Sequence, residues 1–272
     1  MAKKITSKNY FSEDNTYLSA SMIKTFMKCP HRFKQMYFDK TVKFEQTPSM
    51  QLGSMVDMIA TESLRKFKMN YTPKVLKKEN KKLFASQKDT RREVITPAQY
   101  ETALGMAESL MKTDAFKDIE SHDSQVVLNY NMDIGHGFTG IGGMLDKLYI
   151  DEKNKIAIIT DLKTSAAFGT PDRYYWKCED FGYFISMAQY RKLVYLNFPE
   201  IEDVICQHIV VVNDRDKIYP VHTFKFTQTE INNAETILDQ RIDMIAKEKE
   251  FLPRNVGWDD AINIGQSDEE DL

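Results

Sequence analysis

Hydrophobic residues in the first 112 positions recur at the three- and four-residue spacing of amphipathic helices. Either Ser19 or Ser21 suits the cap of a first helix, and Pro30 suits the first turn of a second one. Helices are expected from Leu18–Ser21 to Cys29-Pro30, from Pro30 through Tyr37, from Met50 to Leu64, and from Thr96-Pro97 to about Lys112. The chain therefore opens with a helical portion over about residues 17–112.

The hydrophobic period changes from 3.6 to 2 at Gln125, where the alternation of an antiparallel strand begins. Strands are expected over residues 125–132, 138–150, 155–163, 203–213 and 221–226. Helices are expected over residues 174–196 and after a capping box at Thr227–Glu230. The pattern predicts an α/β (α+β) fold with a central mixed sheet flanked by helices, the sheet core covering about residues 124–250.

The 272 residues suffice for one large α/β domain or two small ones. No repeat or clear linker precedes residue 252, so we expect one domain over 1–255 and a tail over 256–272. No apolar run approaches a membrane span, and the first residues lack a signal-peptide core. Three scattered cysteines indicate a reducing compartment and cannot supply the four thiolates of an iron–sulfur cluster. A cytoplasmic protein without a membrane partner is expected.

Charge is unevenly distributed along the chain. The net charge is −3, but residues 257–272 hold six acidic residues and no base, so the other 256 residues carry +3. Between Arg65 and Arg92, eleven Lys or Arg residues stand against two acids. Such a run is either a solvated face or loop, or a surface that grips phosphates. The acidic tail is typical of a disordered segment, and we expect it to dock a partner or mimic the charge of DNA.

The most informative chemistry lies in Gly143-Met-Leu-Asp146 and in Asp161-Leu-Lys163, which follows the apolar run 156–159. Side chains at i and i+2 of a strand share a face, so Asp161 and Lys163 should point into one space. Asp146, on the preceding strand of the hairpin, can reach the same space. Two converging carboxylates form a binding site for a hard divalent cation such as Mg²⁺. A neighbouring lysine can orient or deprotonate a water. This is the equipment of metal-assisted phosphodiester hydrolysis.

A surface ion pair is the plainer interpretation of Asp-x-Lys on a strand. Two features favour the catalytic one. The preceding strand is too apolar to be exposed, and three glycines, Gly140, Gly142 and Gly143, precede Asp146 and allow close approach of the backbone.

Several motifs occur in an order that is familiar. They are Leu18-Ser-Ala-Ser21 with Cys29-Pro30, Gly53 opening a helix, Gly143-Met-Leu-Asp146, Asp161-Leu-Lys163-Thr164 and the helix around Tyr183 to Tyr190. From about residue 17 to 250 the chain resembles the restriction-endonuclease-like nucleases of the Asp…(Asp/Glu)-x-Lys superfamily. Within it, the chain is similar to RecE-like enzymes of the exonuclease VIII type from phages and prophages. The resemblance implies a restriction-endonuclease-like core.

The resemblance also implies roles for individual residues. Asp146 and Asp161 would bind one or two Mg²⁺ or Mn²⁺ ions, with the backbone carbonyl of Leu162 as a further ligand. Lys163 would position the attacking water and stabilise charge on the phosphate. Asp57 stands where family members often have a histidine ligand, and an aspartate is itself a good ligand for these metals.

Other positions depart from the family pattern. The family's Gln-x-x-x-Tyr helix is matched by Tyr190, whereas Ser186 occupies the glutamine position. Gln189, next to the tyrosine, either substitutes or does not, and both Tyr190 and Gln189 are candidates for catalysis. Gln125 stands where an acidic residue is frequent.

The residues expected to contact DNA come from the serine motif, the basic segment and the surroundings of the carboxylates. They are Ser19, Ser21, Arg32, Lys77, Lys78, Lys81, Lys82, Arg91, Arg92, Thr164 and Tyr183. Tyr174, Tyr175 and Trp176 either stack on bases or an unpaired end, or pack at a helix start.

The leading hypothesis is a metal-dependent exonuclease that resects linear double-stranded DNA from 5′ ends for recombination or repair. The resemblance implies 5′-phosphate products, a possible homo-oligomeric ring around DNA and a single-strand annealing protein as partner. Two alternatives remain open. One is a DNA-binding or scaffold protein of the same fold that has lost turnover; the other is an endonuclease or a nuclease subunit of a larger complex.

Overall fold

The computed structural model of the protein describes Thr6, Tyr10, Ser12 and residues 15–74, 93–168 and 170–252. The segment from Lys77 to Arg92 and the acidic tail, which carry several sequence-based predictions, lie outside these residues.

Helices dominate the N-terminal part of the chain, and three helices of the described residues belong to the second part. The N-terminal ones are α1 (Ala20–Lys28), α2 (Pro30–Tyr37), α3 (Pro48–Asp57), the π-helical turn η1 (Met58–Glu62), α4 (Leu64–Asn70), α6 (Pro97–Lys112) and α7 (Asp114–Lys117). The later ones are α8 (Pro171–Asp180), α9 (Tyr183–Asn197) and α10 (Gln228–Lys247).

The predicted helix starts have the caps that the sequence supplies. Ser19 caps α1 by accepting a hydrogen bond from the Met22 N–H, and Cys29 Sγ does the same at α2, where Pro30 is the first residue. Helices α6 and α10 both begin with a complete capping box, at Thr96 and Thr227. These local contacts explain why both starts could be placed from the sequence.

The main sheet contains six of the described strands. They are β1 (Tyr17–Leu18), β4 (Asp123–Asn131), β5 (Gly140–Asp151), β6 (Ile156–Ala166), β7 (Asp203–Asn213) and β8 (Val221–Lys225). The order is β1-β5-β6-β7-β8, with β4 also paired to β5. The β1–β5 and β6–β7 pairs are parallel and the others antiparallel, so the predicted mixed sheet is confirmed. A separate parallel pair joins β2 (Tyr71–Pro73) to β3 (Glu93–Ile95).

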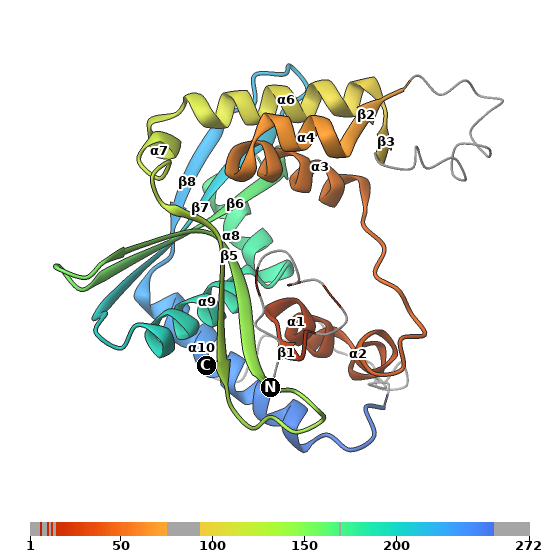
Figure 1. Cartoon of the computed structure of the whole chain (residues 1–272), viewed down its shortest axis with the longest axis vertical. Helices are drawn as coiled ribbons and strands as arrows, with labels where there is room; N and C mark the ends of the chain where they lie inside the picture. Colours follow the sequence, from red (N-terminus) through yellow and green to blue (C-terminus); the bar gives the residue numbers. More distant parts are fainter. Residues whose placement is uncertain are drawn as a thin grey trace, which may run out of the picture.

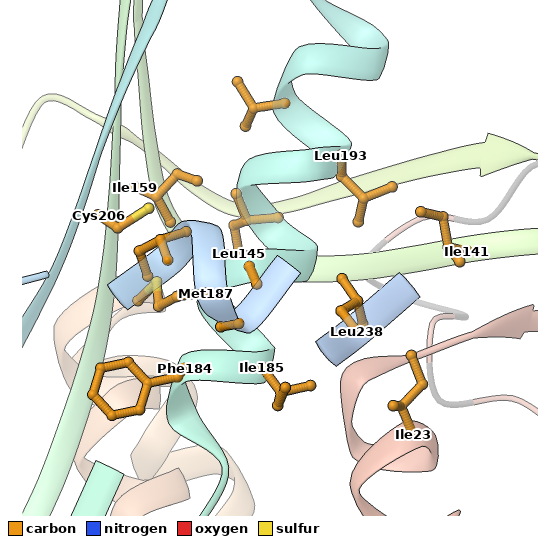
Figure 2. Packing of buried hydrophobic residues seen from close by; sticks show 14 of the residues in the cluster. Ile23, Ile141, Leu145, Ile159, Phe184, Ile185, Met187, Leu193, Cys206 and Leu238 are labelled. Carbon is orange, nitrogen blue, oxygen red and sulfur yellow. The ribbon is translucent and has the colours of Figure 1, made fainter. Parts of the chain in front are cut away.

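Two hydrophobic clusters cover the two faces of this sheet. One joins the sheet to α1, α2, α8, α9 and α10, and the other joins it to α3, α4, α6 and α7. Figure 1 shows α3, α4 and α6 on one side of the strands and α1, α9 and α10 on the other. In Figure 2, Ile23, Leu145 and Leu193 lie among the buried side chains that join α1, β5 and α9. Both faces are therefore buried, as in α/β architectures.

Two expected helices differ from the structure, and three short strands were not expected. The single helix expected over 174–196 is two helices, because Gly182 adopts a left-handed conformation (φ 62°) between α8 and α9. The helix expected over 50–64 begins at Pro48 and passes into the π turn after Asp57. Strands β1, β2 and β3 are only two or three residues long, which is too short for a periodic pattern to reveal. Across the described ranges, no helix has the length and apolar content needed to cross a bilayer.

Candidate functional site

The strands β5 and β6 separate where the predicted carboxylates lie. Their ladder ends at the Lys147–Thr160 pair, while β6 continues beside β7 to Ala166. The Leu162 N–H, which has no β5 partner, donates a hydrogen bond to Asp146 Oδ2 at 2.9 Å. The N–H and C=O of a strand residue point toward the same neighbouring strand, so the Leu162 carbonyl faces this opening as well.

Asp161 and Lys163 share this opening. If the β5–β6 register were extended by one residue, Asp146 would stand opposite Asp161. Lys163 Nζ forms an ion pair with Asp161 Oδ2, as the i, i+2 spacing predicts. Asp161 is buried, whereas Lys163 remains partly accessible. The sheet therefore gathers two carboxylates and one ammonium group in a single space.

Asp57 reaches the same space from the end of α3. Its Oδ2 accepts a hydrogen bond from Gln125 Nε2 at 3.2 Å, and the same amide lies 3.3 Å from Thr61 Oγ1. Its Oδ1 is buried without a hydrogen-bond partner among the described residues. Gln125 adopts a left-handed backbone conformation (φ 53°) opposite Asp146, an uncommon conformation that concentrates at functional sites.

The pKa values show that negative charge is crowded here. Burial, and then the neighbouring Asp161, raise the pKa of Asp57 to about 6. Burial, and then Asp161 and Asp57, hold the pKa of Asp146 well above its usual range. Burial alone would raise the pKa of Asp161 too, but Lys163, together with His208 and Lys24, outweighs burial and the pKa is lowered. Of the three carboxylates, only Asp161 has a lowered pKa.

Lys163 stays protonated at neutral pH. Burial by itself would lower its pKa, but the Asp161 and Asp146 carboxylates outweigh this effect and raise it. The protonated form can orient a water or hold a phosphate oxygen, which fits the orienting role expected from the sequence.

The donor set fits a hard divalent cation. Carboxylate and carbonyl oxygens are the ligands that Mg²⁺ and Mn²⁺ prefer, and Mg²⁺ is commonly held by one or two carboxylates and several waters. The unpartnered Asp57 Oδ1 and the raised pKa values of Asp57 and Asp146 both indicate that positive charge is missing. Within the described ranges, no group of three or more His, Cys, Asp and Glu side chains is arranged to hold a metal ion. The carboxylate and carbonyl oxygens thus lie close together but do not form a complete coordination shell.

Helix α9 places the remaining candidates. Gln189 is fully buried, and its amide donates to the backbone carbonyls of Leu18 and Gly142, both at 2.9 Å. These contacts join β1 and β5, which makes Gln189 a positioning residue for the sheet. Tyr190 packs over Gly143, where an added Cβ would come within 3.0 Å of its ring. Burial, and then Asp161 and Asp146, raise the pKa of Tyr190 well above its usual range, so its hydroxyl stays protonated.

The predicted DNA contacts are in varied environments. Ser19 serves as a helix cap, and Ser21 and Arg32 are exposed on α1 and α2. Thr164 Oγ1 lies 3.1 Å from the position of a Cβ added to Gly53, so α3 passes close to β6 there. Tyr183 has its ring centroid 5.2 Å from Lys163 Nζ. The six basic candidates, Lys77, Lys78, Lys81, Lys82, Arg91 and Arg92, lie outside the described residues.

Sequence reasoning missed His208, which lies beside Asp161 in the β6–β7 register. His208 Nε2 is 3.6 Å from Asp161 Oδ2, and Nδ1 shares a 2.7 Å hydrogen bond with the Tyr174 hydroxyl. Burial lowers its pKa to about 3, so the ring is neutral. A histidine inside the apolar strand 203–213 was the only signal available, and the strand register needed to use it was unknown.

Lys24 of α1 was missed as well. Its Nζ donates to Ser186 Oγ at 3.0 Å and lies 5.8 Å from the Tyr183 ring centroid. Burial, and then the nearby Lys163, lower its pKa to about 8. Nothing in the spacing of the sequence links α1 to β6, so only the fold reveals this second lysine.

Comparisons with known proteins agree with this geometry. Residues 19–257 match the family model described as "PDDEXK-like domain of unknown function (DUF3799)". A solved structure from Eubacterium rectale, described as a "Putative exonuclease", aligns with a TM-score of 0.64 at 19% identity. The alignment covers 90% of this chain and 87% of that one, and shows a shared fold.

Two further comparisons add no argument. A solved structure named SSO0001 aligns with a TM-score of only 0.30 at 16% identity, covering 84% of this chain and 88% of that one. No curated protein matches the chain. Because the family model spans most of the sequence and the mixed sheet agrees with it, the protein belongs to the family of PDDEXK-like domains, and the restriction-endonuclease-like fold predicted from its motifs is confirmed.

Proposed function

We propose that the protein is a metal-dependent deoxyribonuclease, and specifically an exonuclease that hydrolyses phosphodiester bonds of linear double-stranded DNA in the 5′ to 3′ direction. The observation that carries the proposal is the convergence of Asp146, Asp161 and Lys163 where β5 and β6 separate. Membership of the PDDEXK-like family and the exonuclease description of the Eubacterium rectale structure support it.

Each residue of the site would have a distinct role. Asp146, Asp161 and the Leu162 carbonyl would hold Mg²⁺ or Mn²⁺, with Asp57 as a further ligand. A bound ion of this kind polarises the scissile phosphate and lowers the pKa of a water. Lys163 would orient the attacking water and neutralise charge that develops on the phosphate, since the neighbouring carboxylates raise its pKa and favour the ammonium form. Tyr190 stays protonated, and its uncharged ring packs over Gly143 close to both carboxylates.

The biological setting is proposed on the same basis. Resected ends expose single strands, so a single-strand annealing protein is the expected partner, and recombination or repair the expected process. A homo-oligomeric ring around the DNA would keep the protein on its substrate through successive rounds of hydrolysis.

Digestion of duplexes labelled at one 5′ or one 3′ end tests activity and polarity together. The protein should release acid-soluble nucleotides from the 5′ end in Mg²⁺ or Mn²⁺ and none in EDTA. Asp161→Ala and Lys163→Ala should each lower the rate at least 100-fold, because each removes a group from the reacting centre. Asp243→Ala, which removes an exposed carboxylate of α10, is the matched control and should retain full activity.

Other outcomes point to the alternatives. Tight DNA binding without cleavage in either metal would favour a scaffold protein, an alternative that the incomplete coordination shell and Gln125 keep open. Nicking of closed circular DNA would favour an endonuclease. Release from the 3′ end would overturn the proposed polarity alone.

A further inference from the structure

Lys24 is a half-buried cation with unused hydrogen-bonding capacity. An ammonium group has three donors, and the one hydrogen bond that Lys24 makes to the described residues is with Ser186. No Asp or Glu of the described residues lies within ion-pair distance of its Nζ. Asp161 acts on Lys24 electrostatically but forms its ion pair with Lys163, so Lys24 keeps donors for a further anion.

The fold builds a place for this side chain. Gly182, between α8 and α9, packs against the aliphatic part of Lys24, and a Cβ at Gly182 would come within 2.7 Å of Lys24 Cδ. Ser186, one turn into α9, fixes the ammonium end. The glycine therefore serves both the left-handed turn and the passage of the lysine.

An aromatic platform adjoins the two lysines. The Tyr183 ring lies 5.8 Å from Lys24 Nζ and 5.2 Å from Lys163 Nζ, so it connects the two ammonium groups. Phe181 stacks on Tyr183, with ring centroids 5.6 Å apart and planes 29° apart. Phe181 is 54% exposed, so much of its ring is open to solvent.

We infer that Lys24, Tyr183 and Phe181 form a nucleotide subsite beside the carboxylates, in which Lys24 contacts a phosphate of the DNA strand and an unpaired base stacks on Phe181. The inference rests on the proposed nuclease function and specifies how the strand is held. A lysine with unused donors matches a phosphate, and an exposed ring matches the face of any base, so the subsite accepts DNA without sequence preference. The unpaired base implies that the duplex end opens before hydrolysis.

Equilibrium binding in EDTA tests this subsite without turnover. The probe is a fluorescein-labelled duplex with a short unpaired end, followed by anisotropy over a range of NaCl concentrations. Lys24→Gln should weaken binding about tenfold and reduce the slope of log K against log salt by about 0.7 to 0.9, the value for one lost phosphate contact. Lys24→Arg should restore the slope. Lys192→Gln, on the α10 side of α9, is the matched control and should leave the slope unchanged.

The proposed stacking of a base on Phe181 is tested with a second variant. Phe181→Ala should weaken binding of the unpaired end about tenfold and leave binding of a blunt duplex nearly unchanged, while the salt slope stays the same. A 2-aminopurine at the unpaired end should be quenched by the unaltered protein and less so by Phe181→Ala. Thermal unfolding of every variant identifies those that fail to fold.

The results separate this inference from the function on which it rests. If the unaltered protein does not bind DNA, the proposed nuclease function fails. If it binds, and folded Lys24→Gln and Phe181→Ala variants keep its affinity and salt slope, the subsite is overturned while the nuclease proposal stands.

Discussion

At the scale of single residues, Asp57, a proposed metal ligand, lowers the stability of the folded protein when its carboxyl group is ionised. Its pKa of about 6 lies above the value near 4 of an aspartate in an unfolded chain, so the folded state binds this proton more tightly. Stability therefore falls as pH rises from about 4 through about 6, and the cost persists above that range. Asp57→Asn should raise the free energy of unfolding by about 3 kcal/mol at pH 8 and change it little near pH 4.

Denaturant unfolding of both proteins in EDTA at the two pH values measures this difference. Asn keeps the shape of Asp and can still accept the hydrogen bond from Gln125, so the variant isolates the charge. Asp114→Asn, at an exposed carboxylate on α7, is the control and should change stability by less than about 0.5 kcal/mol. A variant less stable than the unaltered protein at pH 8 would show that Asp57 is stabilised rather than strained.

At the scale of elements, the approach of β4 to β5 depends on Gly140. A Cβ there would overlap the Tyr130 carbonyl oxygen and lie within 2.9 Å of the Asn131 Cα, both backbone atoms that cannot move independently. Gly140→Ala should therefore cost about 3 kcal/mol, seen as a lower melting temperature. Gly137→Ala is the matched control: its φ of +80° carries strain of about 1 kcal/mol, but nothing lies within 4 Å of the added Cβ. Equal losses in both variants would contradict this account of the ladder.

The elements that the sequence predicted well are those with local determinants. The helix expected from Thr96-Pro97 to about Lys112 is α6, whose capping box marks its start, and the strand expected over 203–213 is β7. The break between α8 and α9 escaped prediction because hydrophobic spacing continues across Gly182, although a glycine is itself a local signal for a helix end. Tertiary packing adds to this signal, since a Cβ at Gly182 would meet the Lys24 side chain.

The candidate site likewise contains contacts that the sequence predicts and contacts that only the fold reveals. Asp161 and Lys163 come together through the two-residue period of one strand, which the sequence displays directly. His208 meets Asp161 only through the register of β6 with β7, and Lys24 meets Tyr183 only through the packing of α1 on α9. Local period therefore predicts half of this site, and the other half requires the assembled fold.

At the scale of the whole molecule, charge separates along the chain. Residues 1–256 carry a net +3 and residues 257–272 carry −6, so a chain of net charge −3 contains a cationic body. A polyanion such as DNA is attracted to the body and repelled by the tail, over distances set by the salt concentration. The tail should therefore weaken DNA binding most strongly when salt is low.

Deletion of residues 257–272 should tighten DNA binding several-fold at about 50 mM salt, with the difference disappearing toward 0.5 M as the Debye length falls below about 5 Å. Anisotropy titrations of labelled duplex in EDTA measure this. A second variant that replaces the six acids by Asn and Gln keeps the length of the tail and should behave like the deletion, because the effect belongs to charge. If the deletion tightens binding and the neutral tail does not, the tail acts by occupying space. If neither changes the affinity at low salt, the tail does not imitate DNA.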